Sequence, residues 1–244
     1  LLQFSENLLG SVNPYTGLAL KDDPALAFVS CINEDPLIWL STLGGMSENG
    51  MQLVDESFKK WLQAKGVSSP SGKERESLRT EFIIETQNRA YGKLSGFLRK
   101  MGVKQPLTEQ NVMSFATMPL MRQHYDYVDN HAYWGHPNFL GAQWGLPSTF
   151  DTGSVMAKMA YVPAYLFPTR LFGKPFVVTE FNYCYPNMCR AEGGVLMGAY
   201  ASLQGWDAIY RFGYMGIEEQ FNERGTCFFD SVDDPMQLIS DRLG

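Results

Sequence analysis

Apolar segments of strand length alternate with helical segments along most of this chain, and this order limits its fold more than any other feature. Strands are predicted at residues 25–32, 103–108, 125–129, 174–179 and 206–213. Helices are predicted at residues 3–12, 53–65, 74–101, 117–124, 190–204 and 234–243. Such alternation favours an α/β fold with parallel strands joined by crossover helices. The run 25–32 is almost continuously apolar, as expected for a strand buried on both faces.

The length of the chain permits one domain of this kind. Its 244 residues are close to the ~250 that eight strand–helix units need. Internal repeats, low-complexity tracts and convincing linkers are absent from the sequence, so we predict a single domain over residues 1–244. Residues 36–52 and 134–165 are predicted to be long loops, which in compact domains are often functional.

Charge and cysteine content exclude several classes of protein. The net charge of -6 gives no basic footprint for a nucleic acid, and no apolar stretch reaches the ~18–20 residues of a membrane span. The four cysteines are too dispersed for a disulfide framework; they are Cys31, Cys184, Cys189 and Cys227. Cys184 and Cys189 leave pairing or metal binding open, but without a CxxC or HExxH motif we expect neither a metal nor a cofactor.

Polar side chains follow the predicted strands. Asn33 and Glu34 come after the first strand, Asn111 after the second, His131 and Tyr133 after the third, Glu180 and Asn182 after the fourth, and Tyr210, Arg211 and Tyr214 at the last. The carboxyl ends of parallel barrel strands meet at one rim, where active sites lie. We therefore expect these side chains to contribute to one site.

Two carboxylates on such a rim suit cleavage of a glycosidic bond. One carboxyl group protonates the leaving oxygen, and the other attacks the anomeric carbon or activates a water molecule. Like charges a few ångströms apart also favour keeping one of the two groups protonated. A single Glu after a strand is more often a solvated strand end. Glu34 and Glu180 together, each after an apolar strand, favour the catalytic interpretation.

On these residues the chain resembles clan A of the glycoside hydrolases, close to the cellulase-like family 5 and poorly characterised bacterial relatives. Ile32-Asn33-Glu34 is similar to the end of the clan's fourth strand, where an Asn precedes the acid/base. Residues 177–182, Val-Val-Thr-Glu-Phe-Asn, are similar to its seventh strand, which ends in the nucleophile. His131-Ala132-Tyr133 is similar to its His-x-Tyr element after the sixth strand.

The resemblance implies a (β/α)8 TIM barrel and a role for each matching residue. Glu34 is implied as general acid and then base, and Glu180 as the nucleophile of a retaining β-glycosidase or endoglycanase. Substrate-binding residues are expected to be Asn33 at the sugar 2-hydroxyl, His131 at the −1 subsite, Tyr133 orienting Glu180, Trp134, Trp144 and Tyr214 as stacking rings, and Asn111 and Asn182 nearby.

The resemblance also implies that this chain covers about strands four to eight. The N-terminal strands would then belong to another part of the same polypeptide, and relatives of this kind are mostly secreted or periplasmic. The expected partner is a carbohydrate substrate, whose sugar and linkage stay open. A catalytically silent carbohydrate-binding barrel is the alternative. A serine hydrolase, a metal hydrolase and a nucleotide-dependent oxidoreductase are disfavoured because GxSxG, HExxH and GxGxxG motifs are absent.

Overall fold

The computed structural model describes residues 1–42, 45–215 and 227–244. These residues form two compact units, Leu1–Tyr127 and Val128–Gly244. In the first unit the elements are α1 (Leu2–Gly10), η1 (Leu20–Asp22), β1 (Val29–Ser30), α2 (Leu37–Thr42), α3 (Glu48–Ala64), α4 (Gly72–Lys100), β2 (Leu107–Thr108) and α5 (Pro119–Arg122). The elements of the second unit are β3 (Val128–Trp134), β4 (Asn138–Phe139), β5 (Ser148–Thr149), η2 (Met156–Lys158), α6 (Tyr161–Leu166), η3 (Phe167–Thr169), β6 (Phe176–Tyr183), α7 (Glu192–Gln204), β7 (Ala208–Arg211) and α8 (Pro235–Leu243).

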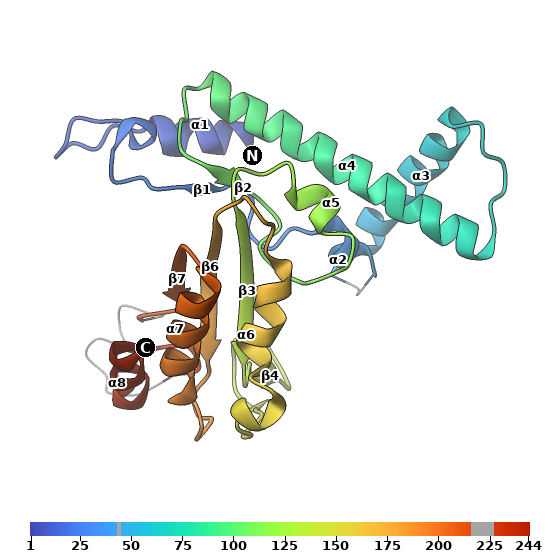
Figure 1. Ribbon diagram of the computed structural model, residues 1–244. Coiled ribbons are helices and arrows are strands. Elements are labelled where there is room, and N and C mark those ends of the chain that lie inside the picture. The colour runs from blue at the N-terminus through green and yellow to red at the C-terminus, as the bar shows by residue number, and fades with distance from the viewer. Residues whose placement is uncertain (43–44, 216–226) are drawn as a thin grey trace. The chain divides into compact units, whose positions relative to one another are not determined.

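Helix α4 organises the first unit. Its last turn carries Arg99 and Lys100, which complement the negative end of the helix dipole. It is followed by Gly102 in the left-handed conformation (φ 91°), as predicted for a helix stop. Helix α3 packs near the start of α4 through Phe58 against Phe82, and α1 packs near its end through Leu9 (Figure 1). Two small cores therefore lie along one long helix.

The strands of the first unit are short. β1 and β2 are parallel, with Val29 opposite Leu107 and Ser30 opposite Thr108. The prediction of a strand over residues 25–32 buried on both faces is wrong: only two residues form a strand, Val29 is half-buried and Ser30 is exposed. The reason is that β1 has a single partner strand among the described residues of this unit.

The second unit is built on a three-stranded parallel sheet in the order β3-β6-β7. Its core contains Val128 and Trp134 from β3, Val178 and Phe181 from β6, and Met197 from α7. Helices α6 and α7 lie alongside these strands (Figure 1). The sheet therefore has one face packed on helices, and alternation places Asp129, His131 and Tyr133 of β3 on the other face.

Strand β6 carries a bulge. Val178 and Phe181 both belong to the core, although they are three positions apart. Against β3 the register changes between Asp129 and His131, and against β7 it changes between Val178 and Phe181. Both neighbouring strands thus meet one extra residue in β6, which is how a bulge re-aims side chains.

Several predicted boundaries differ from the structure. The predicted loop 36–52 contains α2 and the first turn of α3, which Ser47 caps by accepting a hydrogen bond from the Gly50 N–H; Leu43 and Gly44 of that loop lie outside the described residues. The predicted loop 134–165 contains β4, β5, η2 and most of α6. Strands β3 and β6 extend beyond their predicted ends, because pairing with each other continues past the apolar residues. None of the described helices combines the length and apolar character that crossing a membrane requires.

Candidate functional site

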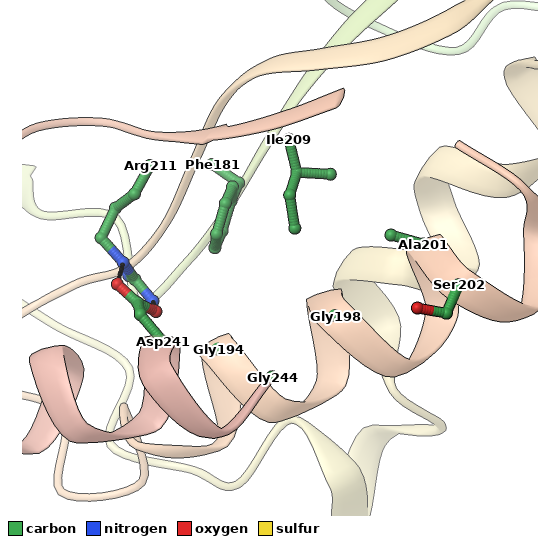
Figure 2. Close-up of a pocket in the computed structure, with 9 residues that line it drawn as sticks. All are labelled: Phe181, Gly194, Gly198, Ala201, Ser202, Ile209, Arg211, Asp241 and Gly244. Atoms are coloured by element: carbon green, nitrogen blue, oxygen red, sulfur yellow. Dashed lines mark hydrogen bonds and ion pairs between the residues drawn. The ribbon is translucent and has the colours of Figure 1, made fainter. Parts of the chain in front are cut away.

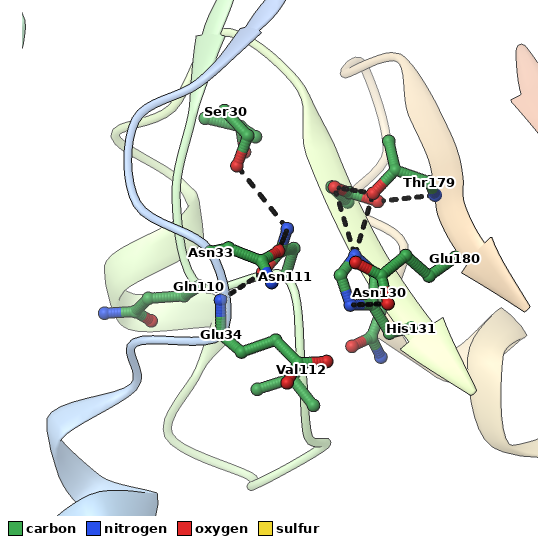
Figure 3. A network of polar contacts seen from close by, with 12 residues as sticks. Ser30, Asn33, Glu34, Gln110, Asn111, Val112, Asn130, His131, Thr179 and Glu180 are labelled. Atoms are coloured by element: carbon green, nitrogen blue, oxygen red, sulfur yellow. Dashed lines mark hydrogen bonds and ion pairs between the residues drawn. The ribbon is translucent and has the colours of Figure 1, made fainter. Parts of the chain in front are cut away.

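Asn111 holds the segment that contains Glu34. Its side chain is buried, and its Oδ1 accepts a 2.7 Å hydrogen bond from the Glu34 N–H (Figure 3). Its Nδ2 donates to Oδ1 of Asn33 at 2.9 Å and to Oγ of Ser30 at 3.4 Å. Glu34 adopts the left-handed conformation with φ 49°, which is costly for a residue with a Cβ. The first unit therefore brings together Asn33, Glu34 and Asn111, and the Asn111 amide stabilises the strained backbone.

Two further carboxyl groups of the first unit, those of Asp35 and Glu109, share one hydrogen-bond donor. Gln87 in α4 donates through Nε2 to Oδ2 of Asp35 at 2.9 Å and to Oε2 of Glu109 at 3.2 Å. Oδ1 of Asp35 also accepts the Gln110 N–H at 3.1 Å. Burial, and secondly the charge of Asp35, raises the pKa of Glu109 to about 8, and burial raises the pKa of Asp35 as well. Glu109 is therefore a neutral acid at neutral pH.

Glu180 is held by two residues of β3. The Tyr133 hydroxyl donates to Oε2 of Glu180 at 2.6 Å, and Nδ1 of His131 lies 3.5 Å from the same oxygen. His131 is directly opposite Glu180 in the strand register. The Glu180 side chain is 20% exposed, whereas His131 is buried. The second unit thus fixes a carboxylate on the polar face of its sheet.

The other side of the His131 ring meets two residues that the sequence did not single out. Nε2 of His131 lies 2.8 Å from Oγ1 of Thr179 (Figure 3). That hydroxyl donates to Oδ2 of the fully buried Asp129 at 2.5 Å, and the Thr179 N–H donates to Oδ1 of Asp129 at 3.0 Å. Asp129 lies two residues before His131 in β3, so strand alternation places both on one face.

Two predicted substrate-binding residues are buried in the second unit. Trp134 belongs to the hydrophobic core, and its Nε1 donates to the Gly153 carbonyl at 2.8 Å. The Asn182 amide donates to the Phe229 carbonyl at 2.7 Å and to the Phe212 carbonyl. Alternation explains Trp134, because it follows Tyr133 and points to the opposite face of β3. Both side chains therefore donate hydrogen bonds to backbone carbonyls of the second unit.

The two remaining predicted aromatic residues are exposed. Trp144 is 57% exposed and Tyr214 is 62% exposed. Trp144 packs beside His136, Phe139 and Phe229, with ring centroids 5.3 to 6.2 Å apart. Phe229 also contacts Tyr133 at 5.4 Å. An aromatic cluster therefore extends from the residue that holds Glu180 to an exposed tryptophan.

Arg211 of β7 has several partners in the second unit, and it donates to Oδ1 of Asn182 at 3.0 Å and to Oε1 of Gln237 at 2.9 Å. Its guanidinium group forms a two-point ion pair with Asp241 of α8, and it stacks on Phe181 at 4.8 Å. These residues line a pocket of about 370 Å³ against the glycines of α7 (Figure 2). Phe181 and Ile209, which also line it, pack in the core of the helix-covered face. Arg211 therefore contacts Asn182 of the expected strand-end residues, and its guanidinium group is also held by Asp241 of α8.

Comparisons of the chain with protein-family models and with curated proteins find no match. The chain has two groups of polar side chains with potential for chemistry, one in each unit. One group presents Glu34 on a strained turn, and the other presents Glu180 between a tyrosine and a histidine.

Proposed function

We propose that this chain contributes both catalytic carboxylates of a retaining glycoside hydrolase, with Glu180 as nucleophile and Glu34 as acid/base. The observation that carries the proposal is the hydrogen bond from the Tyr133 hydroxyl to Oε2 of Glu180, at 2.6 Å. His131 faces the same oxygen. Among the described residues both contacts use Oε2, which leaves Oε1 to attack an anomeric carbon. A nucleophile needs this combination of fixed orientation and partial exposure.

The reaction proceeds in two displacements. Glu34 gives its proton to the glycosidic oxygen, whose bond to the anomeric carbon breaks as Oε1 of Glu180 bonds to that carbon. Water then attacks the anomeric carbon, gives its proton to Glu34 and releases Glu180 as a carboxylate. Esterification removes the charge of Glu180 between the two steps, which allows Glu34 to act first as an acid and then as a base.

The proposed architecture is a (β/α)8 barrel of which this chain supplies about strands four to eight. The parallel pairs β1-β2 and β3-β6-β7 support it, as does the resemblance of the Asn-Glu, His-x-Tyr and Thr-Glu segments to clan A glycoside hydrolases. The rest of the polypeptide would supply the remaining strands, and the resemblance favours a secreted or periplasmic enzyme. The exposed rings of Trp144 and Tyr214 suit a β-linked oligosaccharide or polysaccharide.

The test is covalent labelling of the complete polypeptide with 2-fluoro β-glycosides of the gluco, manno, galacto and xylo series. Mass spectrometry of the peptides is expected to find the fluorosugar on Glu180, and on no residue of a Glu180→Gln variant. Labelling of another carboxylate contradicts the assignment. If no sugar labels the protein and an oligosaccharide still raises its melting temperature, the silent carbohydrate-binding barrel replaces this proposal.

A further inference from the structure

The proton on the Thr179 hydroxyl has a definite direction. Asp129 accepts two hydrogen bonds from Thr179, one from its N–H at 3.0 Å and one from its hydroxyl at 2.5 Å. The single hydroxyl proton therefore points at Asp129. Towards His131, the hydroxyl oxygen presents a lone pair.

This direction assigns the tautomer of His131. Nε2 lies 2.8 Å from the Thr179 oxygen, which accepts, so Nε2 must carry a proton. Nδ1, which faces Oε2 of Glu180 at 3.5 Å, is then the position at which a neutral ring has its lone pair and an imidazolium its second proton. The ring is buried, so water does not compete for either nitrogen.

We propose that Asp129, acting through the hydroxyl of Thr179, is the positioning residue that holds a proton on Nε2 of His131 and so reserves Nδ1 for Glu180. The inference deepens the proposed function and rests on it for its catalytic meaning. The only proton that the ring can gain is beside the nucleophile. A proton at that point stabilises the carboxylate that is released when water cleaves the glycosyl-enzyme.

The substitution Asp129→Asn is expected to reverse the direction of the hydrogen bonds that join residue 129, the Thr179 hydroxyl and His131, which together form the relay. The backbone N–H of Thr179 needs an acceptor, so the amide oxygen takes the place of Oδ1 and the amide nitrogen takes the place of Oδ2. That nitrogen donates to the Thr179 oxygen, whose own proton must then turn to Nε2 of His131. The neutral ring is expected to move its proton to Nδ1, where it donates to Glu180.

The measurement is ¹⁵N NMR of histidine side chains in the complete polypeptide, followed through a pH titration. Variants of His124 and His136 assign the His131 signals. In the wild type, the neutral ring is expected to show a protonated Nε2, and in Asp129→Asn a protonated Nδ1. Thr179→Ser keeps the hydroxyl and is expected to keep the wild-type tautomer, which makes it the matched control.

A second variant covers the case in which Asp129→Asn does not fold. Thr179→Val places a methyl group where the hydroxyl stands, so Nε2 loses its acceptor and the neutral ring is expected to favour Nδ1–H. A wild-type ring protonated at Nδ1, or one unchanged in both variants, overturns the inference. If the tautomers are as expected but no fluorosugar labels the protein, the relay is supported and only the proposed function is refuted.

Discussion

The buried acid Glu109 gives the strongest prediction about stability. Its pKa is raised from 4.5 to about 8, first by burial and then by the nearby charge of Asp35. Glu109→Gln replaces the carboxyl group with an amide of the same shape that is never charged. The amide oxygen still accepts a hydrogen bond from Gln87, so the variant removes the ionisation and little else.

The magnitude and sign follow from proton linkage. Between pH 4.5 and 8 the folded state keeps a proton on Glu109 that the unfolded state has lost, so the free energy of unfolding falls as pH rises. The slope is about 1.4 kcal/mol per pH unit. The contribution of neutral Glu109 is fully present below pH 4.5 and is lost above pH 8, a total on the order of 5 kcal/mol. Domains are stable by only about 5–15 kcal/mol, so the effect is large.

Urea unfolding of the complete polypeptide, measured from pH 4 to pH 9, checks this prediction. Glu109→Gln is expected to match the wild type at the acidic end and to exceed it increasingly towards pH 9. Glu76→Gln, at an exposed position of α4, is the matched control and is expected to leave the pH dependence unchanged. If the difference between Glu109→Gln and the wild type does not grow between pH 5 and pH 8, the assignment of Glu109 as a buried neutral acid is refuted.

Two substitutions test the residues that hold the proposed catalytic carboxylates. Tyr133→Phe removes the donor to the nucleophile; since a hydrogen bond to a charged group contributes about 1.5–3 kcal/mol, steady-state kinetics are expected to show a 10- to 100-fold lower kcat, and an unchanged kcat contradicts the assigned role. Asn111→Ala removes the acceptor for the Glu34 N–H and is expected to cost about 1–3 kcal/mol of unfolding free energy in urea titrations; an unchanged transition would show that the left-handed Glu34 needs no support.

Helices were the most predictable part of this fold. The signals are local: α4 and α8 have a basic last turn, and α4 and α7 are followed by Gly102 and Gly205 in the left-handed conformation. The strands were less predictable, because their ends depend on pairing. β1 shrinks to two residues with one described partner, whereas β6 continues through Glu180 because β3 pairs with it as far as Tyr183.

Some residues of the candidate site were likewise predictable from the sequence, and others were not. Glu34 and Glu180 were named from their places after apolar runs, and Asn111 and Tyr133 are the residues that contact them. The signal for Asp129 was present in its two-residue spacing from His131. Thr179 could not be found by alternation, because alternation places it on the opposite face from Glu180.

The bulge in β6 depends on one residue, Thr179, which interrupts the regular alternation of the strand. Removing Thr179 would restore a simple two-residue repeat, with Val178 and Phe181 still in the core, Glu180 still on the polar face and both neighbouring strands in continuous register. Glu180, the proposed nucleophile, would survive such a deletion, and the N–H and hydroxyl that Thr179 places beside Asp129 and His131 would be lost. A shorter β6 is therefore the more regular strand, and the irregular one is needed to bring two consecutive side chains to the same ring.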